Sequence, residues 1–99
     1  MLMTSSFDVV AEPARRRLLD LLLVEPRSVG ELVQATGMSQ PNTSRHLRIL
    51  RGAGLVASRA AGQQRIYEVR PEGFAELASW LAPYVLRLQA GDRSLAEGR

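Results

Sequence analysis

Residues 39–50 read Ser-Gln-Pro-Asn-Thr-Ser-Arg-His-Leu-Arg-Ile-Leu, a pattern that predicts a helix with two unlike faces. Ser39 is a favoured N-cap residue, and Pro41 is tolerated in a first helical turn. The inner face carries residues at helical spacing, namely Thr43, Leu47 and Leu50. The outer face offers only hydrogen-bonding or cationic groups, as a surface that reads a DNA groove requires: Gln40, Ser44, Arg45, Arg48 and Arg51.

A second short helix is predicted just before this one. Residues 28–31 read Ser-Val-Gly-Glu, a capping box in which the serine and the glutamate satisfy each other's backbone donors. Leu32 and Val33 supply its buried side, and Gly37 ends it. The two helices are therefore joined by a tight glycine turn.

Upstream, the sequence predicts a core helix that begins near Pro13 and ends at Pro26. Its apolar positions show helical spacing: Ala14, Leu18, Leu21 and Leu22. Before it, Phe7, Val9 and Val10 form an apolar stretch too short for a helix that stands alone, so this stretch needs a packing partner.

Downstream, Gly52 and Gly54 end the helix, and residues 55–59 and 65–69 have strand character. Together they predict a β-hairpin. The hairpin carries polar groups suited to a DNA backbone or minor groove, although ordinary solubility explains them equally well: Arg59, Gln63, Gln64 and Arg65.

A last helix is predicted from Pro71, with Pro83 expected to kink or split it. Phe74, Leu77, Ala78 and Leu81 share one face, which Trp80, Tyr84 and Leu88 extend. This apolar surface, with Phe7 and Val10, predicts a dimer interface; the alternative is that it completes the core of one chain. Residues 91–99 are predicted to be a loose tail, which leaves one domain over residues 1–90.

Composition fits one globular domain and excludes several chemistries. The 99 residues are 45% hydrophobic and 23% charged, without an apolar run of the roughly 20 residues that a membrane span needs. The N-terminus has neither a basic start nor an apolar signal core, so we expect a soluble cytoplasmic protein. There is no cysteine and His46 is the single histidine, so we expect no disulfide, no metal site and no cofactor.

The distribution of charge favours a polyanionic partner. All 13 basic residues are arginine, and none of the 10 acids falls between Leu32 and Tyr67. This segment carries five arginines, whereas the flanks together have a net charge of −2. A solvated surface that happens to lack acids is the alternative. RNA is disfavoured because Tyr67 is the only aromatic residue near the basic segment.

The order helix, helix, helix-turn-helix, hairpin, helix resembles the ArsR/SmtB family of bacterial winged helix-turn-helix regulators. The resemblance covers residues 7–84 and is carried by four stretches in the same order. They are Ala-Glu-Pro-Ala-Arg-Arg-Arg-Leu-Leu at residues 11–19, Ser-Val-Gly-Glu-Leu at 28–32, the helix sequence quoted above at 39–50, and Gly-Leu-Val at 54–56. It implies a mainly α fold with a β-hairpin, and a homodimer formed through the first and last helices. The predicted interface consists of Phe7, Val10, Leu77, Trp80, Leu81, Tyr84 and Leu88.

The resemblance also implies that the helix from Ser39 enters the DNA major groove. Two such helices in a dimer, roughly 34 Å apart, would read an imperfect palindrome. Gln40 can pair with adenine and Arg45 with guanine. The expected contacts of this helix are Ser39, Gln40, Pro41, Asn42, Thr43, Ser44, Arg45, His46 and Arg48, and those of the wing are Arg59, Gln63, Gln64, Arg65 and Tyr67.

Many members of the family release DNA when a metal binds to a Glu-Leu-Cys-x-Cys motif or to Asp and His ligands on the last helix. Here residues 31–35 read Glu-Leu-Val-Gln-Ala, so both thiols are missing, and the last helix has no histidine. The sequence therefore resembles the branch that represses transcription, in some cases of its own operon, without a metal switch.

The function predicted from the sequence is a DNA-binding transcriptional repressor. No catalytic motif is present, so an enzyme is not expected. The alternatives are a winged-helix module that binds protein, and a regulator switched by a small hydrophobic ligand at the dimer interface. His46 is expected to contact a phosphate or to pack against another helix, and its protonation in mild acid is hypothesised to tighten DNA binding. The operator, the regulated genes and any effector are not specified by the sequence.

Overall fold

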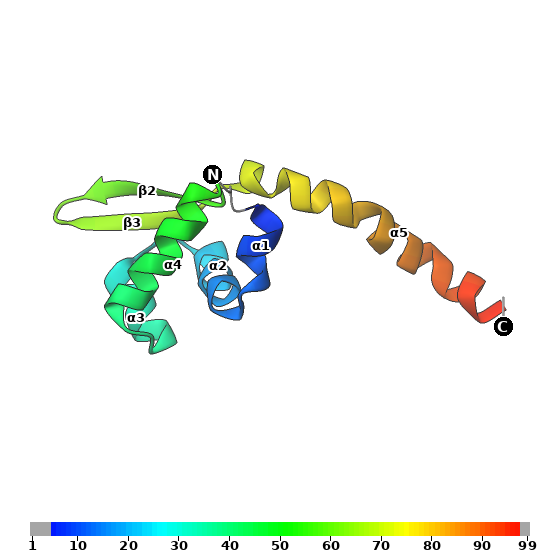
Figure 1. Ribbon diagram of the computed structural model, residues 1–99, viewed down its shortest axis with the longest axis horizontal. Coiled ribbons are helices and arrows are strands. Elements are labelled where there is room, and N and C mark those ends of the chain that lie inside the picture. Colours follow the sequence, from blue (N-terminus) through cyan, green and yellow to red (C-terminus); the bar gives the residue numbers. More distant parts are fainter. Residues whose placement is uncertain (1–4, 98–99) are drawn as a thin grey trace.

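The computed structural model describes residues 5–97, with side chains described up to Arg87 (Figure 1). The described chain is mainly helical with a small antiparallel sheet, as predicted. Its elements follow in the order α1 (Ser6–Ala11), α2 (Pro13–Val24), β1 (Arg27–Ser28), α3 (Val29–Thr36), α4 (Gln40–Gly52), β2 (Val56–Ala61), β3 (Gln64–Val69), the 3₁₀ helix η1 (Pro71–Phe74) and α5 (Ala75–Glu97).

The helix-turn-helix, α3 followed by α4, begins and ends where the sequence predicts. The Ser28 hydroxyl accepts from the Glu31 amide at 3.2 Å, and the Glu31 carboxylate accepts from the Ser28 amide at 2.8 Å. Gly37 ends α3 with a φ of 76°, in the left-handed region that favours glycine. Ser39 then caps α4 by accepting from the Asn42 amide at 3.2 Å, so three residues suffice for the turn.

The hairpin has a shorter loop than predicted. Strands β2 and β3 pair from Val56 opposite Val69 to Ala61 opposite Gln64, which leaves only Gly62 and Gln63 at the tip. The sequence predicts strand ends at residues 59 and 65, because the stretch between them, Ala-Ala-Gly-Gln-Gln, lacks the β-branched and aromatic residues that are typical of strands. The two-residue strand β1 was not predicted; it pairs with the far side of β3 and gives the order β1-β3-β2.

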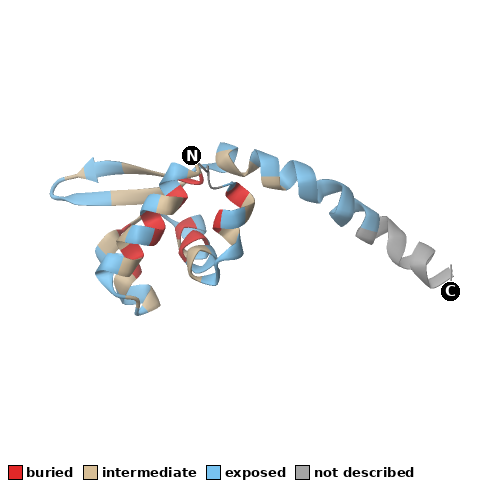
Figure 2. Cartoon of the chain, viewed as in Figure 1, coloured by how far each residue is buried: buried red, intermediate tan, exposed pale blue. Residues whose placement is uncertain are grey.

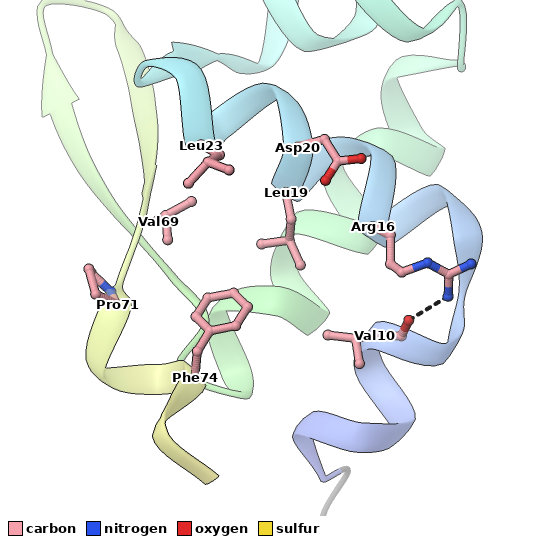
Figure 3. A pocket seen from close by; sticks show the side chains of 8 residues that line it. All are labelled: Val10, Arg16, Leu19, Asp20, Leu23, Val69, Pro71 and Phe74. Carbon is pink, nitrogen blue, oxygen red and sulfur yellow. Dashed lines mark hydrogen bonds between the residues drawn. The ribbon is translucent and has the colours of Figure 1, made fainter. Parts of the chain in front are cut away.

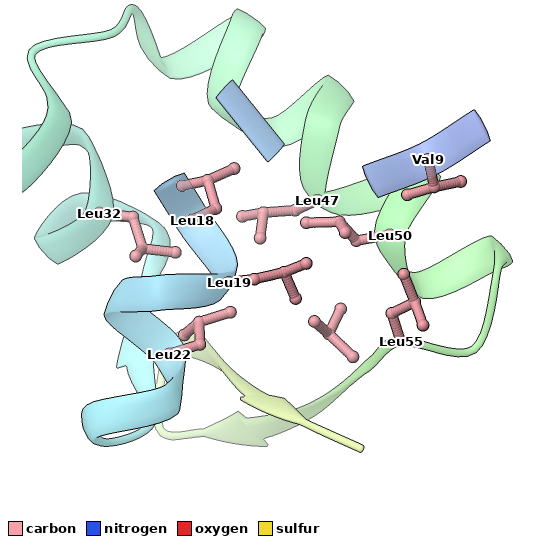
Figure 4. Packing of buried hydrophobic residues seen from close by; sticks show 9 residues of the cluster. Val9, Leu18, Leu19, Leu22, Leu32, Leu47, Leu50 and Leu55 are labelled. Carbon is pink, nitrogen blue, oxygen red and sulfur yellow. The ribbon is translucent and has the colours of Figure 1, made fainter. Parts of the chain in front are cut away.

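The hydrophobic core lies where α2, α3 and α4 meet the base of the sheet (Figure 4). Its buried members are Val9, Leu18, Leu19, Leu22, Leu32, Leu47, Leu50, Leu55 and Val56. Leu21 and Val33 were predicted to be buried, but both are half-buried and Leu19 takes the inner position on α2. The helix that carries the polar outer face is therefore fixed from its inner side by two leucines of this core.

The root of α5 is held by a close backbone contact. Gly73 lies against the turn that follows α4, and a Cβ added there would lie 1.9 Å from the Gly54 carbonyl oxygen. Gly54 itself has a φ of 79°. The start of α5 is thus seated directly on the turn between the helix-turn-helix and the hairpin.

Beyond this root, α5 leaves the body of the protein and gives the chain a long axis of 59 Å against 33 and 20 Å in the other directions (Figure 1). Pro83 was expected to kink or split this helix, and the split is wrong, because the helix continues through Pro83. Ser79 and Pro83 are exposed, so water can satisfy the carbonyl that loses its amide partner. The helical backbone extends to Glu97, so a boundary at residue 91 stays a prediction.

Candidate nucleic-acid interface

The outer face of α4 is polar, and Figure 2 shows the exposed positions of this helix in pale blue. Gln40, Arg45, Arg48 and Arg51 are exposed, and Ser44 is half-exposed. The Arg45 guanidinium donates to the Asn42 side-chain oxygen at 2.8 Å. This bond holds Arg45 along the first turns of α4 and leaves its other N–H groups available to a base or a phosphate.

Two expected DNA contacts are wrong, because their side chains face inward. Thr43 is fully buried, as its place on the inner stripe predicted, and its hydroxyl donates to the Ser39 carbonyl at 2.8 Å. His46 is 5% exposed and lies among core residues. Neither side chain reaches the outer surface, so neither can approach a base or a phosphate.

His46 instead joins the two helices at the start of the chain to α4. The Arg15 guanidinium donates to His46 Nδ1 at 3.2 Å and to the Val9 carbonyl at 2.8 Å. Arginine has no acceptor, so Nδ1 must be the unprotonated nitrogen and the imidazole is neutral. Burial lowers the pKa of His46 below its ordinary value of 6.5, and the charges of Arg45 and Arg15 lower it further, against a smaller opposing effect of Glu12.

The two arginines of the hairpin, Arg59 and Arg65, lie on opposite faces of it. Ser58 pairs with Tyr67 and Ala60 with Arg65, whereas Arg59 pairs with Ile66. Because successive side chains point to opposite faces, Arg65 shares the face of Ser58 and Tyr67, and Arg59 points the other way. The predicted wing contacts therefore do not form one surface.

Tyr67 is the wing residue least suited to DNA, because its ring packs partly buried against the core. Gln63 and Gln64 are exposed at the tip, as are Arg59 and Arg65 on the strands. The sequence did not show the role of Ser58. Its hydroxyl accepts from Arg51 at 3.3 Å and from Arg65 at 3.1 Å, and only the strand register reveals this meeting point.

A second surface, formed by α1 and α5, is apolar. The rings of Phe7 and Trp80 meet edge to face with centroids 5.6 Å apart, and those of Trp80 and Tyr84 lie 5.0 Å apart. Trp80 and Tyr84 are nevertheless each 55% exposed, so one chain does not bury them. Leu81, Val85 and Leu86 are also exposed. The sequence prediction left out Val85, although it lies on the predicted apolar face four residues after Leu81, and it left out Leu86, which lies outside that face. Leu77 is half-buried, and the side chain of Leu88 lies outside the described part.

Val10 does not join this aromatic surface but lines a neighbouring apolar groove of about 570 Å³ (Figure 3). Leu19, Leu23, Val69, Pro71 and Phe74 form its other apolar walls, with Arg16 and Asp20 on α2. The Arg16 guanidinium donates to the Val10 carbonyl at 2.7 Å and to the Ala11 carbonyl at 3.0 Å. Arg16 therefore fixes α1 as one wall of the groove.

The described residues show neither a metal site nor a membrane-spanning helix. They contain no group of three or more acidic, histidine or cysteine side chains arranged to hold a metal ion. Among the described helices, none combines the length and the apolar character needed to cross a membrane.

A helix-turn-helix followed by a two-stranded wing defines a winged helix-turn-helix protein. The model of the arsR family of bacterial regulatory proteins matches residues 12–58. The regulator Rv0081 of Mycobacterium tuberculosis is 42% identical over 88 residues, which cover 88% of this chain and 76% of Rv0081. The chain belongs to the ArsR family of bacterial transcriptional regulators. This membership confirms the predicted fold, the role in regulation and the expectation of a protein that is not an enzyme.

Further relatives cover most of the chain. The transcriptional repressor SdpR of Bacillus subtilis is 27% identical over 93 residues, 94% of this chain and 100% of SdpR. The crystal structure of a possible transcriptional regulator for arsenical resistance has a TM-score of 0.76 at 34% identity and covers 97% of both chains. The solution structure of a homodimeric winged helix-turn-helix DNA-binding domain from Mycobacterium bovis has a TM-score of 0.67 at 30% identity, covering 82% of this chain and 75% of that one.

Proposed function

We propose that this regulator is a homodimer that represses transcription by covering an imperfect palindrome in double-stranded DNA. The observation that carries the proposal is the outer face of α4, where Gln40, Arg45 and Arg48 are exposed together. Gln40 would read adenine and Arg45 guanine, because their side chains match the paired acceptors and donors at those base edges. Arg48 lies a turn further along and would contact a phosphate.

The second α4 of the dimer would lie about one helical turn of DNA away, roughly 34 Å. The aromatic surface of Phe7, Trp80 and Tyr84, in which Trp80 and Tyr84 are more than half exposed, supports dimerisation through α1 and α5, as does the homodimeric relative from M. bovis. Repression rather than activation is supported by the name of SdpR, a relative over its full length. A DNA partner also favours a cytoplasmic location.

The proposed repressor does not use the cysteine switch of its metal-sensing relatives. Val33 and Ala35 occupy the positions of the two thiols, and neither side chain can ligate a metal. Release from DNA would then depend on protein concentration or on another effector. DNA affinity that is unchanged by Zn²⁺, Cd²⁺ or arsenite would support this part of the proposal, and a metal-induced loss of affinity would refute it.

Fluorescence anisotropy tests the central claim. The protein would be titrated into labelled duplexes that carry its own upstream region or a random sequence, at several salt concentrations. We expect tighter binding to the upstream region and a log affinity that falls linearly with log salt. Equal affinity for both duplexes would contradict regulation of its own operon, and no affinity for either duplex at low salt would contradict DNA binding altogether.

The groove beside α1 favours one second candidate, a repressor switched by a small hydrophobic ligand. Its walls are mainly apolar, and its volume falls in the range of small-molecule sites. Leu23, at its rim and 75% exposed, offers a blocking position. Under this candidate, a dye that fluoresces in apolar sites would bind the wild type and weaken its hold on DNA, and Leu23→Arg would abolish both effects. Binding of the dye without any effect on DNA affinity would show that the groove does not control DNA binding, and would refute this candidate.

A further inference from the structure

One cluster on the helical side of the wing is not explained by folding. The Ser58 hydroxyl on β2 accepts from Arg51 Nη1 at 3.3 Å and from Arg65 Nε and Nη2 at 3.4 and 3.1 Å. Arg51 comes from the last turn of α4 and Arg65 from β3. Two guanidinium groups from different elements are thus brought onto one oxygen atom.

The electrostatics of this cluster are unfavourable without an anion. Within the part of the chain whose side chains are described, the ion pairs are Arg27 with Glu25 and Arg70 with Glu72, so neither Arg51 nor Arg65 has a carboxylate within 4.0 Å. Both arginines are exposed, so no burial of apolar surface holds them there. Like charges this close repel each other, and a bound anion would remove the repulsion.

We propose that Arg51, Arg65 and Ser58 form a phosphate clamp that takes one backbone phosphate of bound DNA. Both guanidinium groups have further N–H donors, and the Ser58 hydroxyl can donate its own hydrogen, so donors from three side chains converge. A phosphate group accepts several hydrogen bonds and carries the missing negative charge. The clamp joins the end of α4 to the middle of the wing, and therefore fixes the angle between the two DNA-contacting elements when DNA is bound.

The clamp rests on the proposed DNA-binding function but makes a narrower claim. A merely basic hairpin predicts that each arginine contributes independently to DNA affinity. The clamp instead predicts that Arg51 and Arg65 act on the same phosphate and are therefore coupled, whereas Arg59 on the opposite face of the hairpin is not coupled to Arg51.

Double-mutant cycles on a random duplex test this difference without knowledge of the operator. Arg51→Gln and Arg65→Gln should each weaken binding by roughly tenfold. The double variant should be weakened much less than a hundredfold, and its salt slope should fall by about 0.9 in total, the value for one phosphate. The Arg51→Gln and Arg59→Gln pair is the reference cycle, and its effects should multiply. Arg70→Gln, which removes a paired arginine of equal charge, controls for net charge.

The outcomes separate the clamp from the function on which it rests. If the wild type binds duplex but the Arg51 and Arg65 effects multiply and the slope falls by about twice 0.9, the clamp is wrong and DNA binding stands. If the wild type does not bind duplex at low salt, both proposals fail. Unchanged thermal melting of each variant would show that the changes do not arise from unfolding.

A second arm distinguishes the source of the phosphate. Inorganic phosphate is titrated into the wild type by calorimetry at constant ionic strength. We expect no saturable binding, because a single phosphate lacks the contacts that α4 would make to the same duplex. Saturable binding that disappears in Arg65→Gln would assign the clamp to a free phosphorylated ligand and overturn the assignment to DNA.

Discussion

At the scale of single residues, the contact between His46 and Arg15 shows that tertiary packing decides whether a polar side chain of α4 faces the core or the solvent. They lie 31 positions apart in the sequence, yet the guanidinium and the imidazole are 3.2 Å apart. Through its second bond to the Val9 carbonyl, Arg15 connects α1, α2 and α4 at one point. The sequence left His46 as either a phosphate contact or a helix-packing contact, and its burial and its bond to Arg15 fit only the second.

This geometry predicts that acid destabilises the fold through His46. Its pKa is lower in the folded state than in the unfolded state, so the unfolded chain binds more protons as the pH falls below about 6.5. Stability is therefore complete above that pH and declines as the pH falls through the folded-state pKa. The thermal midpoint should fall between about pH 7.5 and about pH 5.5 by more in the wild type than in His46→Gln. An equal fall in both proteins would show that other groups cause it.

Arg45 is predicted to carry base preference. Arg45→Ala should lower affinity for the operator by roughly 1–3 kcal/mol and leave binding to a random duplex much less affected, because a guanine contact exists only at the right base. Arg48→Ala, one turn along the same face, is the matched comparison and should weaken both duplexes alike. Anisotropy titrations of both variants on both duplexes measure this. Similar losses on both duplexes from Arg45→Ala would place it on a phosphate instead.

At the scale of elements, the caps made most of the fold predictable, because each acts within four residues. The capping box at Ser28, the left-handed Gly37 and the N-cap at Ser39 fix α3, the turn and α4 without reference to the rest of the chain. Strand β1 was not predictable in this way. It has two residues, too few for an alternating pattern, and exists because β3 offers it an edge.

The contact between Gly73, at the root of α5, and the turn at Gly54 also joins residues that are distant in the sequence. This contact leads to a prediction about stability. Gly73→Ala should destabilise the protein by roughly 1–3 kcal/mol, because the Gly54 carbonyl belongs to the backbone and cannot rotate away as a side chain would. Gly52→Ala is the control. It has open space around it at the end of α4, so it should be neutral or stabilise by up to about 1 kcal/mol. Urea denaturation measures both, and a neutral Gly73→Ala would mean that the turn can yield.

At the scale of the whole molecule, the position of α5 decides what a single chain can bury. The periodicity of residues 74–84 predicted an apolar helix, but it did not predict that this helix leaves the body of the protein. Trp80 and Tyr84 are more than half exposed as a result. A pattern in the sequence shows that a face is apolar, whereas only the fold shows whether the same chain covers it.

The exposed face of α5 predicts how the dimer can be disrupted. Trp80→Asp and Leu81→Asp should each place an unpaired charge in the interface and weaken dimerisation by roughly 3–5 kcal/mol, or about two to four orders of magnitude in the dissociation constant. The Phe7 ring packs against the Trp80 ring, so Leu81→Asp keeps both rings and separates interface loss from loss of this aromatic pair. Sedimentation velocity should give monomers for both variants and dimers for Val24→Asp, an exposed apolar control on α2. Dimers of Leu81→Asp would move the interface away from this face.

The division of α4 into a buried side and an outward side has a consequence for how such regulators diverge. Leu47 and Leu50 are committed to the core, whereas Gln40, Arg45 and Arg48 contribute nothing to it. After gene duplication, the outward positions are open to mutation without loss of the scaffold. One copy can therefore acquire a new DNA target site through two or three substitutions while the other copy keeps the ancestral site. Each regulator then no longer binds the target site of the other.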